Sequence, residues 1–201
     1  MPETKVRRSR TEMIAETTTK LIAAARRSFA QVGYAATSMD ELCAEVGLTR
    51  GALYHHFGGK EGLLEAVVKQ IDQEMGAKMD AVWYSTHDRW EGFQLSCQAY
   101  LGLALDPEVQ RIVLQDAPAV LGQRLRDIDA QASIAYITEE LRVLMGQGRI
   151  SETDPEALAW MLNGAMMDAA LWIAASDNPE EALQKAQQSL ALILNGIATK
   201  D

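Results

Sequence analysis

Two short helical segments joined by a glycine turn dominate residues 38–59. The run SMDE at 38–41 is a capping box, in which the Ser38 hydroxyl can accept from the Glu41 N–H while the Glu41 carboxylate reaches back. Gly47 stops the helix that starts there, because glycine turns sharply where other residues are strained. Thr49 can cap a second helix, which Gly58-Gly59 ends. The stretch therefore predicts helices over 39–46 and 50–57 with a tight turn between them.

Helix signals continue along the rest of the chain, so the sequence predicts an all-α fold of about nine helices. Apolar residues between 21 and 32 recur at helical spacing, Gly33 follows them as a helix end, and a longer helix is expected from Lys60 to roughly Val82. Later helices are expected to start at Asp106-Pro107-Glu108, Asp154-Pro155-Glu156 and Asn178-Pro179-Glu180. Each places an Asx residue at the N-cap, proline at the first helical position and an acid in the first turn.

Charge is distributed unevenly. The chain of 201 residues is −9 overall, but residues 1–60 hold nine basic and six acidic side chains and residues 61–201 hold ten and twenty-two. An acidic protein with a basic N-terminal end suggests that this end alone meets a polyanion, although a solvated basic tail explains it about as well. No run of 18 uncharged apolar residues is present, so we expect no membrane span and a cytoplasmic location. Cys43 and Cys97 give no disulfide or zinc pattern.

The pair of short helices forms a helix-turn-helix, whose second helix enters the DNA major groove with its N-terminal end first. Arg50 could bond guanine O6 and N7, and Ala52 could touch a thymine methyl. Side chains one turn further on would pass phosphates. The candidate DNA contacts are Thr37, Ser38, Thr49, Arg50, Gly51, Ala52, Tyr54, His55, His56 and Lys60.

His55 and His56 invite a metal interpretation, which the spacing disfavours. Neighbours on a helix point about 100° apart, whereas histidines at i and i+4 suit one ion. One packed and one solvated histidine is the other structural alternative to backbone contact. We predict no metal, no cofactor and no catalytic residue, because the sequence has no G-x-S-x-G, phosphate loop or convincing triad.

At these residues the chain resembles the TetR family of transcriptional repressors. The resemblance spans Phe29 to Val68, FAQVGYAATSMDELCAEVGLTRGALYHHFGGKEGLLEAVV. It implies that Thr37, Ser38 and Lys60 contact phosphate, that residues 49–52 face bases, and that Tyr54 and His56 contact the backbone, with His55 near either. Gly58-Gly59 and Gly62 depart from the family pattern, which usually has longer polar residues, and this predicts a more mobile hinge into the following helix.

The expected organisation is a basic flexible tail over 1–12, a DNA-binding domain over 13–60, a connecting helix from 60 to about 82, and an effector and dimerisation domain over 75–201. The tail's Lys5, Arg7, Arg8 and Arg10 could reach a minor groove, or the tail could simply be disordered.

Two late segments carry more apolar positions than one helix stripe needs, so we expect them to be covered on more than one side. The resemblance implies a four-helix bundle across a two-fold axis, and a dimer suits a motif that reads two halves of a palindromic operator. A monomeric bundle core is the alternative. The predicted interface residues are Leu158, Leu162, Ala165, Ala169, Trp172, Leu183, Leu190, Ile193, Leu194 and Ile197.

A pocket for a flat or apolar ligand could be lined by adaptable methionines and large aromatic side chains. The candidates are Trp83, Trp90, Phe93, Cys97, Tyr100, Leu114, Met145, Trp160, Met161, Met166 and Met167. For each of them an ordinary core position is the alternative. Asp116 and Asp168 are carboxylates among apolar neighbours, so each could meet a ligand or pair with an arginine such as Arg111. Cys97 could sense oxidants if it were exposed.

Three functions remain open at this point: a ligand-responsive repressor, which the residues favour, an enzyme, and an architectural or partner-binding helical protein without a small-molecule effector. DNA selection and a ligand screen would separate them.

Overall fold

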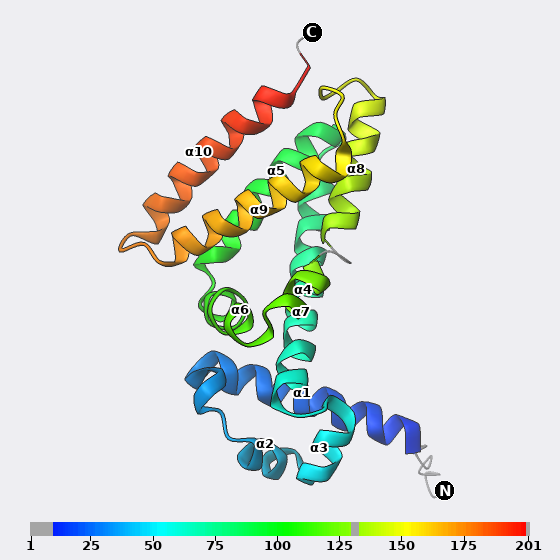
Figure 1. Cartoon of the computed structure of the whole chain (residues 1–201), viewed down its shortest axis with the longest axis vertical. Coiled ribbons are helices and arrows are strands. Elements are labelled where there is room, and N and C mark those ends of the chain that lie inside the picture. Colours follow the sequence, from blue (N-terminus) through cyan, green and yellow to red (C-terminus); the bar gives the residue numbers. More distant parts are fainter. Residues whose placement is uncertain (1–9, 130–132, 200–201) are drawn as a thin grey trace, which may run out of the picture. The chain divides into compact units, whose positions relative to one another are not determined.

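The computed structural model describes residues 10–129 and 133–199, which are helical nearly throughout (Figure 1). These residues contain ten α-helices, one 3₁₀ turn and one π-helical segment, and no β-strand. The all-α prediction is therefore confirmed. By its internal contacts the chain divides at Val68 and Lys69 into an N-terminal unit and a C-terminal unit. The helix α4 (Lys60–Trp83) contributes residues to both.

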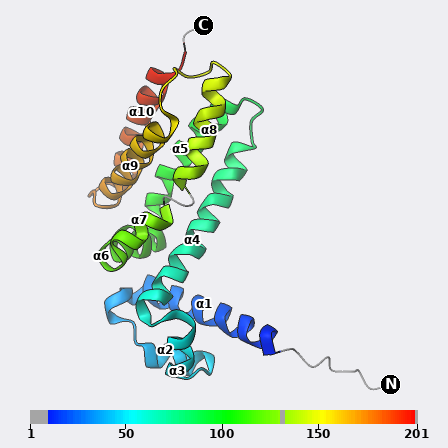
Figure 2. The same cartoon turned by 45° about the vertical axis from the view of Figure 1, so that its right-hand side comes forward.

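The N-terminal unit consists of α1 (Arg10–Ala36), α2 (Met39–Val46), α3 (Arg50–Phe57) and the first turns of α4, with α2 packed against α1 and α3 (Figure 2). Gly33 breaks the helical path of α1 with φ 81°, so the predicted helix end is present as a kink. Residues 10–12, expected in the tail, are the start of α1; Lys5, Arg7 and Arg8 lie outside the described residues.

The short helices begin and end where the caps predicted. The Ser38 hydroxyl accepts from the Glu41 N–H at 3.4 Å, and the Thr49 hydroxyl accepts from the Ala52 N–H at 3.2 Å. Gly47 closes α2 with φ 70° and Gly58 closes α3 with φ 72°. Apolar positions of all four helices meet in one small core, in which the largest fully buried side chains are Leu21, Phe29, Leu53, Leu63 and Leu64.

The C-terminal unit is built from longer helices. They are α5 (Arg89–Gly102), the 3₁₀ turn η1 (Leu103–Leu105), the π-helical η2 (Val109–Asp116), α6 (Ala117–Leu121), α7 (Gln123–Asp129), α8 (Ala135–Gly146), α9 (Pro155–Ala174) and α10 (Pro179–Ile197). The helix count exceeds the predicted nine because the stretch after Asp106 is divided into several pieces. Gly122, with φ 52°, separates α6 from α7.

The helix α9 occupies the centre of this unit. It packs against α8, α5 and α10, and α10 packs in turn against α5. Its buried stripe includes Leu162, Met166, Ala170 and Ile173 at helical spacing. The predicted caps are present: Asp154 accepts from the Ala157 N–H at 2.7 Å, and Asn178 accepts from the Glu181 N–H at 3.4 Å. Proline at the first position of both helices fixes where they start.

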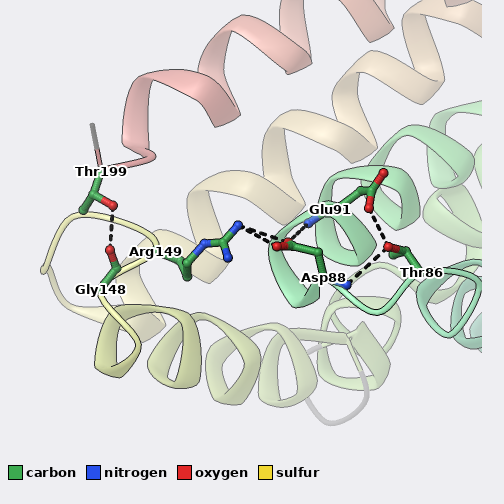
Figure 3. A network of polar contacts seen from close by, with 6 residues as sticks. All are labelled: Thr86, Asp88, Glu91, Gly148, Arg149 and Thr199. Carbon is green, nitrogen blue, oxygen red and sulfur yellow. Dashed lines mark hydrogen bonds and ion pairs between the residues drawn. The ribbon is translucent and has the colours of Figure 1, made fainter. Parts of the chain in front are cut away.

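A polar network ties the start of α5 to the α8–α9 connection and to the end of α10 (Figure 3). Asp88 caps α5 by accepting from the Glu91 N–H at 2.9 Å and pairs with Arg149 at 2.8 Å. These two contacts lower the pKa of Asp88, the backbone hydrogen bond having the larger effect. At the other end, Thr199 donates to the Gly148 carbonyl at 2.5 Å, and its N–H donates to the Arg149 carbonyl at 3.0 Å.

Candidate nucleic-acid interface and ligand cavity

The second motif helix, α3, is exposed along most of its surface. Leu53 is fully buried, Ala52 and Phe57 are partly covered, and every other residue of the helix is exposed. Tyr54 keeps 52% of its surface accessible although it is a large aromatic residue. A helix that buries one narrow stripe and presents small, basic and aromatic side chains is suited to lie in a groove of another molecule.

Arg50, the predicted base-reading residue, is engaged with a neighbour in the structure. Its Nε lies 3.3 Å from Asp40 Oδ1, and its Nη1 donates to Asp40 Oδ2 at 3.5 Å. Both side chains are more than half exposed, so the pair is weak and can exchange for another acceptor. The carboxylate from α2 holds the guanidinium at the start of α3, and the predicted contact of Arg50 with a base stays a prediction.

Lys60 has contacts within its own unit. Its Nζ donates to the Ala35 carbonyl at 3.2 Å and lies 4.6 Å from the centre of the Tyr34 ring. The ammonium therefore binds the C-terminal end of α1, where the helix dipole favours a cation. An ammonium has three donors, so its predicted phosphate contact stays a prediction, but a change at Lys60 would also loosen this unit.

Thr37 and Ser38 differ in what their hydroxyl groups can reach. Thr37 is buried; its Oγ1 donates to the Gly33 carbonyl at 2.9 Å and lies 2.9 Å from Ser28 Oγ. The structure therefore removes Thr37 from the predicted phosphate contacts, because its hydroxyl is already used inside the unit. Ser38 is partly exposed and caps α2.

His55 and His56 are both exposed in the last turn of α3, with ring centres 5.4 Å apart. The alternative of one packed histidine is wrong. Among the described residues no three metal-ligating side chains gather anywhere. The predicted contact of the two histidines with a phosphate backbone stays a prediction.

The turn between α3 and α4 requires the glycines that departed from the family pattern. Gly59 has φ 127°, and a Cβ there would lie 3.2 Å from the Tyr54 ring. At Gly62 a Cβ would lie 1.8 Å from the Phe57 carbonyl oxygen, so no side chain fits this backbone. Longer side chains at Gly59 and Gly62 would therefore collide with the Tyr54 ring and the Phe57 backbone, whereas Gly58 has open space around it. The mobile hinge that was expected stays a prediction.

The C-terminal unit contains a partly open cavity of about 360 Å³. Its walls come from the second half of α4, from α5, from α8 and from the middle of α9. The lining residues are Asp72, Gln73, Met75, Gly76, Met79, Asp80, Trp83, Phe93, Ser96, Cys97, Tyr100, Ser133, Tyr136, Ile137, Asn163 and Met166. A cavity of this size accommodates a small organic molecule.

Five of the predicted pocket residues, Trp83, Phe93, Cys97, Tyr100 and Met166, line this cavity. The others do not, for three physical reasons. Trp90 and Leu114 are buried in the core, where Trp90 stacks on Phe93 at 5.8 Å. Asp116 pairs with Arg111 at 3.5 Å, the alternative that its sequence left open. Trp160 and Met161 are exposed on α9, Asp168 is exposed too, and Met145 and Met167 are only partly covered outside the cavity.

The largest contribution to the cavity comes from α4, of which only Trp83 was predicted from the sequence to line a pocket. Its lining residues Asp72, Met75, Met79 and Trp83 recur at helical spacing. This stripe could have been found, but the lining residues of α4 also include two carboxylates and a glutamine, which interrupt the apolar pattern. Tyr136 and Asn163 were also missed, since nothing in their local sequence distinguishes them from other helix residues.

Cys97 is a buried thiol rather than an exposed sensor. Burial raises its pKa to about 12, so the reactive thiolate is scarce at neutral pH. Burial likewise raises the pKa of the Tyr136 phenol to about 12, and neighbouring acidic groups add to the effect. Both groups meet the cavity in their neutral, protonated forms.

The two late helices carry apolar surface on both sides. Leu162, Leu190 and Leu194, predicted at a dimer interface, are buried in the core of the single chain. The remaining predicted interface residues are exposed or partly covered: Leu158, Ala165, Ala169, Trp172, Leu183, Ile193 and Ile197. Large apolar side chains join them on the surface, namely Trp160, Met161, Leu171 and Leu192.

A shallow groove of about 240 Å³ crosses this outer surface. Its walls include Ala165, Ala169 and Trp172 of α9 and Leu190 and Ile193 of α10. Because α9 is apolar on its exposed side as well as on its buried side, it is apolar along most of its length. Among the described residues it is the one helix that could cross a membrane by length and composition alone. Helices of globular proteins with two covered sides meet the same criterion, so this is weak evidence for a membrane.

Comparison with known proteins decides the family. Residues 90–197 match the family described as tetracyclin repressor-like, C-terminal domain, and residues 21–67 match the family described as bacterial regulatory proteins, tetR family. The chain belongs to the TetR family. This is a family of DNA-binding transcriptional regulators, typically ligand-responsive repressors, and not of enzymes. The resemblance seen over Phe29 to Val68 is thereby confirmed and extends to the C-terminal unit.

Relatives cover nearly the whole TetR-family chain. The transposon Tn10 TetC protein of Escherichia coli is 28% identical over 180 residues, 86% of each chain. A TetR-family regulator of Pectobacterium atrosepticum, known as a crystal structure, is 46% identical with a TM-score of 0.85 and covers 96% of this chain and 99% of its own. The structure of RolR with resorcinol has a TM-score of 0.73 at 18% identity, covers 94% of this chain and 90% of its own, and shares the fold.

Proposed function

We propose that this protein is a homodimeric, cytoplasmic repressor that binds a palindromic DNA operator through α3 and releases it when a small molecule occupies the cavity of the C-terminal unit. The observation that carries the proposal is the exposure of α3. This helix leaves Arg50, Gly51, Tyr54 and both histidines accessible while only Leu53 is fully buried. Thr49 caps its N-terminal end, the end that a helix-turn-helix presents to base edges.

Two copies of the chain are proposed because α9 and α10 expose more apolar surface than a monomer leaves uncovered. Trp172 is 52% exposed and Met161 is 73% exposed, on the side of α9 opposite its buried stripe. Contiguous apolar patches of this kind mark protein interfaces. A two-fold dimer covers the same patch on both chains and supplies two reading helices for two half-sites.

The effector is proposed to act through α4. The beginning of this helix, up to Val68, belongs to the unit that carries the reading helix, and its second half lines the cavity. A ligand in the cavity contacts one end of a continuous helix. It shifts the protein away from the DNA-binding arrangement only to the extent that it binds the other arrangement more tightly.

The first test is selection of bound sequences from a random double-stranded DNA pool at physiological salt. The proposal expects a palindrome to be enriched, and an Arg50→Ala protein to lose discrimination at one position of each half-site. A folded protein that enriches no palindrome, or selects the same sequences without Arg50, would contradict it. In that case an architectural helical protein without an effector becomes the better description.

A further inference from the structure

The cavity of the C-terminal unit has a definite charge. Among its described lining residues there are two carboxylates, Asp72 and Asp80, and no lysine, arginine or histidine. An anionic ligand placed there meets two like charges and no cationic side chain among the described lining residues. The acidic excess of residues 61–201, with ten basic and twenty-two acidic side chains, points the same way at longer range.

Of the two carboxylates in the cavity wall, Asp72 is the partly buried one. Within the described part of the chain it has no ion-pair or hydrogen-bond partner, and it is partly buried. Burial raises its pKa, as expected for a carboxylate that has lost water and gained no cation in return. A ligand cation beside it would restore the missing partner.

Aromatic rings form another part of the wall. Trp83 meets Phe93 edge-on with ring centres 6.0 Å apart, and meets Tyr136 in the same manner at 6.4 Å. All three residues line the cavity. The negative faces of such rings attract ammonium groups, and they attract them most strongly where water is excluded. The methionines beside them give polarizable, adaptable surface for an apolar body.

The side-chain amide of Asn163 is an independent feature of the cavity wall that could bind a ligand. Its residue is 8% exposed, it lines the cavity, and among the described residues its amide has no hydrogen-bond partner. Its amide atoms are not fully enclosed, because no enclosed side-chain nitrogen or oxygen of the described chain lacks a partner. A polar group of a ligand in the cavity could hydrogen-bond to this amide, which can both donate and accept.

We propose that the effector is an organic cation with an aromatic or apolar body, its ammonium group beside Asp72, its body between Trp83, Phe93 and the methionines, and a polar substituent within reach of Asn163. This inference rests on the proposed function, since it names the chemical class of ligand for the same cavity. It excludes carboxylates, phosphates and other anions as effectors.

The test uses three probes with one shared benzyl body: benzyltrimethylammonium, the neutral benzyl methyl sulfone and the anion phenylmethanesulfonate. Titration calorimetry on the full-length protein without DNA should show the cation binding about tenfold more tightly than the sulfone, and no binding of the anion. Asp72→Asn should weaken the cation about tenfold and leave the sulfone within about twofold. Asp177→Asn, an exposed carboxylate outside the cavity, is the matched control and should change neither.

Equal affinity for the cation and the sulfone, or a cation affinity unaffected by Asp72→Asn, would overturn the inference. Trp83→Leu gives an independent variant, expected to weaken the cation more than the sulfone. Because no DNA is present, the ligand class can fail while operator selection succeeds. Failure of the proposed function appears instead in the selection experiment, whichever probe binds.

Discussion

The two units of this protein differ in how much apolar surface remains after their own cores are formed. The N-terminal unit has a small core and two eight-residue helices, and nearly all its geometry is set by caps and glycines. The C-terminal unit has helices of up to twenty residues whose apolar side chains exceed what its own core can hold. The excess lines a partly open cavity and forms an outer apolar face.

The difference shows where each kind of function can be placed. A reading helix needs a rigid backbone and free side chains, which the short capped helices of the N-terminal unit provide. A ligand pocket and a dimer interface need apolar side chains that remain accessible in the folded chain. The long helices of the C-terminal unit provide them. Changes that test this contrast should therefore affect one unit and spare the other.

The largest effect is expected from Gly62→Ala. The new methyl group would meet the Phe57 carbonyl oxygen, a backbone atom that cannot move without disturbing the α3–α4 turn. We expect a loss of about 3 kcal/mol of stability and of specific DNA binding, measured by urea denaturation and fluorescence anisotropy. Gly76→Ala, on the same helix with open space around it, should instead stabilise by about 0.5–1 kcal/mol. Similar behaviour of the two variants would show that the turn is not built on Gly62.

Trp172→Glu should separate the two chains and leave each unit folded. A charge in the outer apolar face would be buried without a partner in the dimer, and we expect association to weaken by about 2–3 kcal/mol in sedimentation equilibrium. Tyr84→Glu places the same charge at another aromatic residue that is more exposed, but outside this face. If both proteins sediment as dimers, the interface lies elsewhere.

Arg50→Ala should cost about 1–3 kcal/mol on the selected operator and much less on unrelated DNA. The companion variant Asp40→Asn should tighten binding, because it removes both the competitor for Arg50 and a negative charge beside the phosphates. Competition anisotropy with specific and random duplexes measures both. Loss of affinity in Asp40→Asn would mean that Asp40 positions Arg50 for DNA instead of competing with it.

The smallest effect concerns pH. The lowered pKa of Asp88 means that its ionised form stabilises the fold above the usual aspartate range near pH 3.9, and that this contribution disappears as the pH falls through the lowered value. Asp88→Asn keeps a helix-capping side chain but loses the pair with Arg149. Its urea midpoint should lie slightly below that of the native protein at pH 7, and the difference should be smaller at about pH 2.5, because the stabilisation is lost as the pH falls through the lowered pKa of Asp88. A constant difference at both pH values would assign the effect to the cap.

The sequence predicted the N-terminal unit almost residue by residue, because Ser38, Gly47 and Thr49 each determine a backbone event within a few residues of themselves. It could not show that Thr37 is buried, since that depends on Ser28 and Gly33 in the preceding helix. It also could not show that a Cβ at Gly62 would lie 1.8 Å from the Phe57 carbonyl oxygen, since that depends on how the turn between the two helices folds.

In the C-terminal unit the sequence predicted helices and their starts but not which face of each helix turns inward. Both sides of α9 are apolar, so Leu162 and Trp172 have similar patterns although one is buried and the other exposed. For the same reason Trp160 and Met161 were expected in the pocket. The cavity depends on α4, α5, α8 and α9 meeting in space, and its polar residues Asp72 and Asn163 interrupt the patterns from which core positions are predicted.

The most direct test is the stoichiometry of the complex with the selected operator. A labelled palindromic duplex, held well above the dissociation constant, is titrated with protein and compared with a duplex that carries one half-site. The account predicts saturation at two chains per palindrome and a much weaker complex with the single half-site. Saturation at one chain per palindrome, or equal affinity for both duplexes, would contradict the claim that two copies read one operator.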